Sequence, residues 1–316
     1  MRTIACIGMA VADVVVGPFD SFHFQQDVTP VEHVQISPGG DAANVALNLA
    51  ALSTPTTLFA KVGDDMPGQF LLRYYQQKGL DTRGICVSQQ AATSTCVTLV
   101  KAGGERVFLY HGGATDTLCA ADIVAAEVAA HDIVHASGFF LLPALEQDGI
   151  VELFAAAKAQ GRQTSLDVGW DSQNRWMSLI RPVLPLLDYF MPTENEAREI
   201  TGQSTPQAMA GVLLDAGVKQ VVIKRGDQGA YIHDGREGRD IPPFAAPFVL
   251  DSSGAGDAFV AGFLAAIARD VAFCDAVRYA NAAGSLAVRQ YGASGALSSF
   301  SQLKQLVCEA CDENLI

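Results

Sequence analysis

The segment from Leu250 to Asp257 combines a turn of small residues with a carboxylate at the start of an apolar helical pattern. Gly254, Ala255 and Gly256 would let backbone amides approach a ligand closely, and a helix start adds unpaired N–H groups and a positive dipole end. This arrangement predicts an anion hole suited to phosphate. Asp257 follows it directly and could accept a proton from a hydroxyl that attacks the phosphate. The alternative is that Asp257 only caps the helix, and this segment alone favours neither interpretation.

A second turn of small residues lies near the N-terminus, where Gly39 and Gly40 precede a helical pattern over residues 42–52. This pattern is apolar nearly all round, which predicts a buried helix. Asp41 and Asn44 place polar side chains at the glycine end of that helix. A ligand could therefore lie against the backbone there while it meets hydrogen-bonding groups.

Asp13 lies among apolar residues soon after the first strand-like run, residues 4–8. A buried carboxylate needs hydrogen-bond partners. The hydroxyls of a sugar could supply them, and so could neighbouring groups in a core or a turn. The strand-like run does not continue into a G-x-G-x-x-G pattern, because only Gly8 is present, so it does not indicate a dinucleotide site.

Composition limits the classes of function. The 316-residue chain has a net charge of −13 and no Lys/Arg cluster, which argues against nucleic acid as a partner. It has no run of about 18 apolar residues, so we expect no membrane span, and its start lacks a signal-peptide pattern. Seven scattered cysteines indicate reduced thiols in a cytoplasmic protein. Cys308 and Cys311 have C-x-x-C spacing, but without a second pair they do not indicate a metal site.

Strand-like and helical patterns alternate from about residue 132, which predicts an α/β fold with a mainly parallel sheet covered by helices on both faces. Ligands bind such sheets beyond the carboxyl ends of the strands, where the motifs above would meet. Two alternating runs, 95–101 and 106–111, predict a hairpin. With the run 31–37 this hairpin would form a small separate sheet. The expected helices include 145–160 and 175–187, and no linker divides the chain.

Two segments resemble the signatures of a known family. Gly39–Ala46, followed by Lys61–Asp65 and Gly68, resembles the first signature of the ribokinase-like (PfkB) carbohydrate kinases. Asp251–Phe259 resembles the second signature. Both stand in the family's order, and the likeness covers essentially the whole chain.

The resemblance implies a ribokinase-like three-layer α/β sandwich, with residues 1–316 in a single kinase domain. A small β-sheet lid would come from about 10–40 and 93–115, and in this family such a lid commonly forms the interface of a homodimer. The implied activity is transfer of the γ-phosphate of ATP, with Mg²⁺, to a hydroxyl of a sugar or nucleoside.

The resemblance also implies roles for individual residues. Asp257 would be the general base, and the amides of Gly254, Ala255 and Gly256 would hold the transferring phosphate. The residues that would bind substrate hydroxyls are Asp13, Gly39, Gly40, Asp41 and Asn44. The residues that would line the nucleotide are Lys224, Arg225, Gly226, Gly229 and Asn281. Asp167 stands where several sugar kinases of the family have an Asp followed by a loop near the substrate.

Three positions depart from the family pattern. Thr193 replaces the Asn of the N-x-x-E element, whose Glu196 would bind Mg²⁺ through a bridging water. Ser252 replaces the usual Thr, which is a mild change. Asp41 stands where ribokinase itself carries Lys. A carboxylate at that position repels phosphate, which favours a neutral sugar over a sugar phosphate.

Many members of the family use a monovalent cation beside the anion hole. Asp251, Ser253 and backbone oxygens around Gly292 could bind K⁺ here, although Ala296 stands where a hydroxyl is often found. Binding of K⁺ by these oxygens, and activation of the enzyme by K⁺, is a prediction distinct from that of the anion hole.

Other activities stay open. A nucleoside kinase of this family would need an aromatic wall around the base, which Phe19, Phe22, Phe24 and Phe108 could form. Some 2-keto-3-deoxygluconate kinases also carry Gly-Gly-Asp in the first signature. A non-catalytic sensor of sugar or ATP would have no need of a proton acceptor at Asp257.

Overall fold

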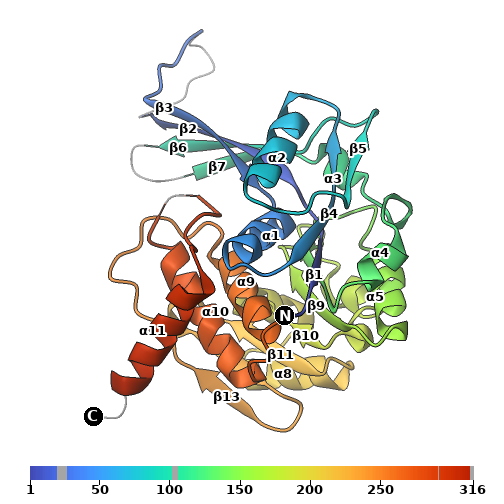
Figure 1. The fold of residues 1–316 in the computed structure, drawn as a ribbon, viewed down its shortest axis with the longest axis vertical. Coiled ribbons are helices and arrows are strands. Elements are labelled where there is room, and N and C mark those ends of the chain that lie inside the picture. The colour runs from blue at the N-terminus through green and yellow to red at the C-terminus, as the bar shows by residue number, and fades with distance from the viewer. Residues whose placement is uncertain (20–26, 102–105, 291, 314–316) are drawn as a thin grey trace.

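A nine-stranded sheet forms the centre of the molecule (Figure 1). The computed structural model describes residues 1–19, 27–101, 106–290 and 292–313. The strands of this sheet, in spatial order, are β13 (Gly238–Ile241), β12 (Ala230–His233), β11 (Gln220–Lys224), β10 (Tyr189–Phe190), β9 (Gln163–Val168), β8 (Ile133–Phe139), β1 (Ile4–Ile7), β4 (Thr56–Gly63) and β5 (Ile85–Ser88). In this spatial order, each pair of neighbouring strands from β11 through to β5 is parallel. At one edge of the sheet, β12 pairs antiparallel with β11 and β13 pairs antiparallel with β12. The predicted mainly parallel sheet is confirmed, although the short strands β5 and β13 were not predicted.

Helices cover both faces of this sheet, because its buried strands carry apolar side chains on both sides. The helices are α1 (Asp41–Ala51), α2 (Met66–Gln77), α3 (Gly113–Asp116), α4 (Ala125–Ala129), α5 (Gly149–Ala159), α6 (Trp176–Ile180), α7 (Glu194–Thr201), α8 (Pro206–Asp215), α9 (Ala255–Ile267), α10 (Phe273–Ala287) and α11 (Phe300–Glu313). On one side Ile4 and Cys6 pack into a core with α1, α2 and α9 to α11. On the other side Ala5 and Ile7 pack into a core with α5 to α8. The result is a three-layer sandwich.

A smaller four-stranded sheet projects from the body beyond α1 (Figure 1). Its strands, in spatial order, are β3 (His33–Gly39), β2 (Val11–Phe19), β6 (Thr95–Lys101) and β7 (Arg106–His111). The predicted hairpin is confirmed as the antiparallel pair β6 and β7. The strand register aligns Ser37, Asp13, Cys96 and Tyr110 in one row across the sheet, so these four side chains share a face.

Two predicted helices are shorter in the structure than in the sequence pattern. The helix expected over 145–160 begins only at Gly149, because the preceding residues form turns. The helix expected over 175–187 stops at Ile180. Pro182 and Pro185 lack the backbone N–H that a continuing helix needs, so the chain forms only a short 3₁₀ turn there.

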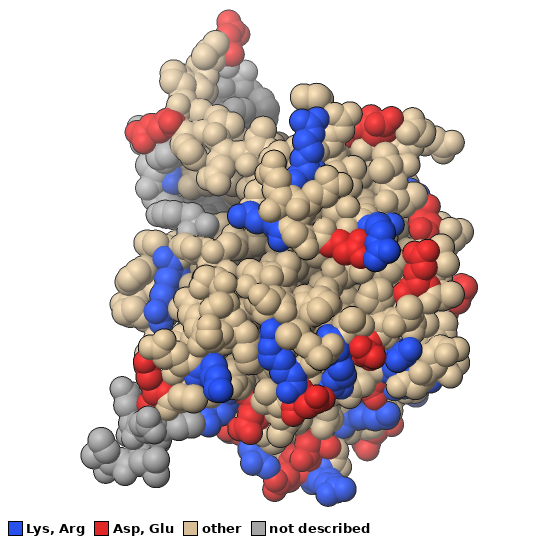
Figure 2. All heavy atoms as spheres, viewed as in Figure 1, with Lys and Arg blue, Asp and Glu red and all other residues tan. Residues whose placement is uncertain are grey.

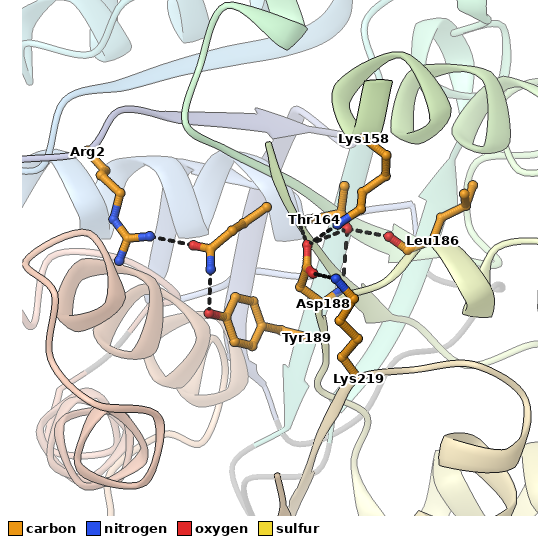
Figure 3. Close-up of polar contacts among 8 residues, drawn as sticks. Arg2, Lys158, Thr164, Leu186, Asp188, Tyr189 and Lys219 are labelled. Carbon is orange, nitrogen blue, oxygen red and sulfur yellow. Dashed lines mark hydrogen bonds and ion pairs between the residues drawn. The ribbon is translucent and has the colours of Figure 1, made fainter. Parts of the chain in front are cut away.

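Polar side chains tie the strands together at the end opposite the candidate site (Figure 3). Asp188, just before β10, accepts hydrogen bonds from Lys158 at 2.6 Å and from Lys219 at 2.8 Å. It also accepts one from the backbone N–H of Thr164 in β9 at 2.8 Å. Burial alone would raise the pKa of Asp188, but the hydrogen bonds from the two lysines outweigh it, and the pKa lies below its usual range. This cluster therefore fixes the starts of neighbouring strands.

Charged side chains of both signs are interspersed over the lower part of the face shown in Figure 2, away from the small sheet. Among the described residues, no helix combines the length and the apolar character that a membrane span requires.

Candidate active site

The predicted turn of small residues forms the start of α9. Gly254 precedes the helix with φ 70°, a left-handed conformation that favours glycine. A Cβ at Gly254 would lie 2.3 Å from the backbone oxygen of Ala293, so a larger residue does not fit. No side chain caps this end, and within the described chain the N–H groups of Gly256 and Asp257 have no hydrogen-bond partner. The helix start therefore offers free amides and a positive dipole end to an anion.

Asp257 is the third residue of α9, and its side chain does not cap the helix. Its Oδ2 instead accepts a 2.9 Å hydrogen bond from Asn44 Nδ2 of α1. Burial raises the pKa of Asp257 well above its usual range, and the negative charge of Asp41 raises it further. A carboxyl group with a raised pKa is suited to accept a proton near neutral pH.

Two further carboxylates are linked to Asp257 through their charges: the charge of Asp41 acts on Asp257 and also on Asp13. A Cβ at Gly39 would lie 2.1 Å from Asp13 Oδ2, so this glycine and this carboxylate are in close contact. Burial, followed by the charge of Asp41, raises the pKa of Asp13 to about 7. Burial, followed by the charge of Asp167, raises the pKa of Asp41 to about 6. The structure thus brings Asp13, Asp41 and Asp257 together from β2, α1 and α9, and it makes an additional negative charge there unfavourable.

Lys224 lies among these acids. It ends β11, and its Nζ forms a 2.8 Å ion pair with Oδ1 of Asp167 near the end of β9. Burial alone would lower the pKa of Lys224, but Asp167 and Glu196 outweigh it, so the pKa lies above its usual range and the ammonium stays charged. The ion pair was not predicted. The sequence did contain a signal for it, because Asp167 and Lys224 each place a charged residue at the carboxyl end of a buried strand.

A cavity of about 960 Å³ opens beside the start of α9. Ala255 and Gly256, which were predicted to form the anion hole, line it, and so does Arg225, which is paired with Glu194 at 3.0 Å. All five residues predicted to line the nucleotide border this cavity, namely Lys224, Arg225, Gly226, Gly229 and Asn281. Its volume lies in the range of small-molecule sites, and its lining mixes apolar and charged groups as a nucleotide requires.

Glu196 belongs to a reciprocal cap at the start of α7. The backbone N–H of Thr193 donates to Glu196 Oε2 at 2.7 Å, and the N–H of Glu196 donates to Thr193 Oγ1 at 3.3 Å. Thr in place of Asn is compatible with this position, because both residues cap helices. The described residues contain no group of three or more His, Cys, Asp or Glu side chains arranged to hold a metal ion. A Mg²⁺ that arrives with ATP needs only one or two protein carboxylates, and the half-buried carboxylate of Glu196 fits that need.

The carboxylate of Asp251 holds the loop before α9. Its Oδ1 accepts a hydrogen bond from the N–H of Ser253 at 2.9 Å, and its Oδ2 accepts one from the N–H of Gly292 at 3.1 Å. These bonds fasten the anion-hole loop to the turn after α10. Binding of K⁺ at Asp251 and Ser253 stays a prediction.

Comparison with known proteins identifies the family. The profile of the pfkB family carbohydrate kinases matches residues 1–299. The chain belongs to the pfkB family. It is therefore an ATP-dependent carbohydrate kinase, and the resemblance inferred from the two signatures is confirmed.

Relatives of this pfkB kinase differ in the sugar they are named for. A ribokinase of Staphylococcus aureus is 28% identical over 276 residues, which cover 85% of this chain and 87% of the relative. A 2-dehydro-3-deoxygluconokinase of Bacillus subtilis is 29% identical over 264 residues, which cover 80% and 81%. The structure of a candidate ribokinase II from E. coli, in complex with ATP and Mg²⁺, matches with a TM-score of 0.84 and 24% identity over 98% of this chain and 100% of that one. This last likeness shows the fold.

Proposed function

We propose that this pfkB kinase transfers the γ-phosphate of ATP to a hydroxyl of a neutral sugar of the ribose or fructose type. The position of Asp257 carries the proposal. This carboxylate adjoins the free amides at the start of α9, where Gly256 borders the nucleotide cavity, and the charge of Asp41 at the start of α1 acts on it. A group between the two substrates can receive the proton of the attacking hydroxyl.

In this mechanism Asp13 and Asp41 accept hydrogen bonds from sugar hydroxyls and orient the reacting one toward Asp257. The hydroxyl oxygen attacks the γ-phosphorus while its proton passes to the Asp257 carboxylate. The amides of Gly254 and Gly256 stabilise the negative charge on the transferring group, whereas the N–H of Ala255, which was predicted to join them, donates to the carbonyl of Ser252 at 3.3 Å. Mg²⁺, when bound with ATP, would neutralise part of the charge of the phosphates, and Glu196 would help to hold it.

The preference for a neutral sugar rests on charge. Asp13, Asp41 and Asp257 all have raised pKa values, with burial as the largest cause, and Lys224 is already paired with Asp167. A sugar phosphate would bring two more negative charges close to these three carboxylates. The hydroxyls of a neutral sugar would instead donate hydrogen bonds to them.

A nucleoside is a weaker candidate for the phosphate acceptor than a free sugar. Phe22 and Phe24, two of the four aromatic residues considered for a base-binding wall, lie outside the described residues, as does the side chain of Phe19. Phe108 is 61% exposed. Phe108 by itself forms no wall around a base, and on this ground we expect a nucleoside to be phosphorylated more slowly than a free sugar.

We also propose that residues 1–316 act as one kinase domain, with the four-stranded sheet as its lid and as the interface of a homodimer. The apolar face of this sheet supports the dimer. Residues of that face that are more than half exposed are Val34, Ile36, Val107 and Leu109. A second copy of the same sheet would cover them.

Transfer of radiolabelled phosphate to ribose, fructose, 2-keto-3-deoxygluconate, nucleosides and the corresponding sugar phosphates tests the function. We expect the highest kcat/KM with a neutral sugar and a loss of roughly 10²–10⁴-fold in kcat for Asp257→Asn, which keeps size and shape. The melting temperature of the variant should match the wild type within a few degrees. A faster rate with a sugar phosphate, or more than about a tenth of kcat left in the variant, would contradict the proposal.

A further inference from the structure

The ion pair between Lys224 and Asp167 is almost completely buried, with side-chain exposures of 10% and 6%. Removing two charges from water costs free energy that their mutual attraction does not reliably recover, so such a pair is weak evidence for a stabilising role. A buried charged group beside a substrate cavity is a candidate for a part in the chemistry.

The position of the ammonium points to the anion hole. A Cβ placed on Gly256 would lie 3.7 Å from Lys224 Nζ, and apart from its chain neighbours and the backbone of its own helix, no other atom of the described residues would lie within 4 Å of it. Gly256 contributes one of the free amides at the start of α9. The ammonium and the positive end of the helix therefore face the same space.

Two positive ends that face one space repel each other unless an anion lies between them. The nearby carboxylates of Asp167, Glu196 and Asp257 supply negative charge around the ammonium. During the reaction the Asp257 carboxylate is neutralised by the proton it receives. The surrounding negative charge then falls by one unit, and the ammonium can interact more strongly with the phosphoryl group.

We propose that Lys224 is a catalytic residue whose ammonium turns from Asp167 toward the transferring phosphoryl group. Asp167 is a positioning residue that holds Lys224 at the anion hole between turnovers. In the transfer step the bond from the sugar oxygen to the γ-phosphorus forms and the bond from that phosphorus to ADP breaks. The sugar proton goes to Asp257, and Lys224 keeps its own proton throughout. This inference rests on the proposed function.

A pair of variants isolates Lys224. Asp167→Asn and the double variant Asp167→Asn/Lys224→Met both lack the carboxylate, so they differ only in the ammonium. The double variant removes both charges together, which avoids leaving one buried charge unpaired. We expect kcat to be roughly 10²–10³-fold lower in the double variant than in Asp167→Asn, as for loss of one group that stabilises the transition state.

A binding measurement gives a second readout that does not depend on turnover. Calorimetry with ADP, aluminium fluoride and sugar measures affinity for a mimic of the transferring phosphoryl group. We expect that affinity to fall at least tenfold between the two variants, while the affinity for ADP alone changes less than threefold. Equal kcat and equal affinity for the mimic in the two variants would show that Lys224 only balances Asp167, and would overturn the proposal.

Lys219→Met is the matched control. Lys219 precedes the same strand, β11, at its other end, and pairs with Asp188 at the same 2.8 Å distance (Figure 3). Its removal should leave kcat unchanged. Asp257→Asn separates the two proposals. If that variant stays active, the proposed function is wrong. If it loses activity while Asp167→Asn and Asp167→Asn/Lys224→Met have equal kcat, only the role of Lys224 is wrong.

Discussion

The side-chain amide of Asn44 donates a 2.9 Å hydrogen bond to the carboxylate of Asp257, which lies 213 positions away in the chain. The bond joins the first turns of α1 and α9. Asn44 is 4% exposed, and among the described residues its Oδ1 has no hydrogen-bond partner. One hydrogen bond from a buried amide therefore sets the orientation of the proposed base, and it favours the charged form of that base.

Asn44→Ala should raise the pKa of Asp257, because it removes a hydrogen bond that lowers this pKa. The acid limb of the pH profile of kcat/KM should then move to higher pH, and kcat at neutral pH should fall about tenfold, because less of the base is deprotonated. Asn48→Ala is the control, since Asn48 is buried one turn further along α1. It should lower the melting temperature without moving the acid limb, and an unmoved limb in Asn44→Ala would argue against Asp257 as the base.

Asp13 makes the stability of the protein depend on pH. Its pKa rises from an ordinary value of 3.8 to about 7 on folding, mainly through burial and then through Asp41. Between these values the folded protein holds a proton that the unfolded chain has lost, so stability falls as the pH rises across this window. Asp13→Asn should remove that dependence.

The melting temperature of Asp13→Asn should therefore exceed that of the wild type by more at pH 8 than at pH 4, as measured by calorimetry without sugar. The same variant should bind sugar more weakly, because the carboxylate oxygens that accept hydroxyl hydrogen bonds are reduced to one amide oxygen. A melting-temperature difference independent of pH would show that Asp13 titrates normally.

The fold could be predicted where local patterns are strong. The helical pattern over 42–52 corresponds to α1, and the alternating runs over 95–101 and 106–111 correspond to β6 and β7. The strands β5 and β13 were missed, because each has only four residues and neither carries a clear apolar alternation.

The candidate site could be predicted in part. Gly254 and Gly39 were recognisable because each stands in a turn directly before a helical pattern. The pairing of Lys224 with Asp167 was not predicted, because a charged residue at the end of each strand does not tell which residues meet. Its two residues are 57 positions apart on strands β11 and β9, with β10 between them, and only the order of the strands brings them together.

The dimer prediction depends on the apolar face of the small sheet. Leu109→Lys places a charge on that face, where Leu109 is 55% exposed. If the face is covered by a second copy, burying the lysine would cost more than the interface gains, and sedimentation should show a monomer where the wild type is a dimer. Val87→Lys, at a valine of β5 that is 41% exposed, should stay dimeric. A monomeric wild type at micromolar concentration would contradict the prediction.

Gly39→Ala tests whether the sugar lies at Asp13. The added Cβ would lie 2.1 Å from Asp13 Oδ2 and 2.5 Å from its Cγ, so the carboxylate must move away. Loss of a hydrogen bond to a charged group weakens binding by roughly 10–100-fold, and KM for the sugar should rise by that amount while KM for ATP stays within about threefold. Gly211→Ala in α8 is the control, because its Cβ would meet no described atom within 4 Å apart from its chain neighbours and the backbone of its own helix. That variant should keep both KM values, and an unchanged KM for the sugar in Gly39→Ala would place the sugar away from Asp13.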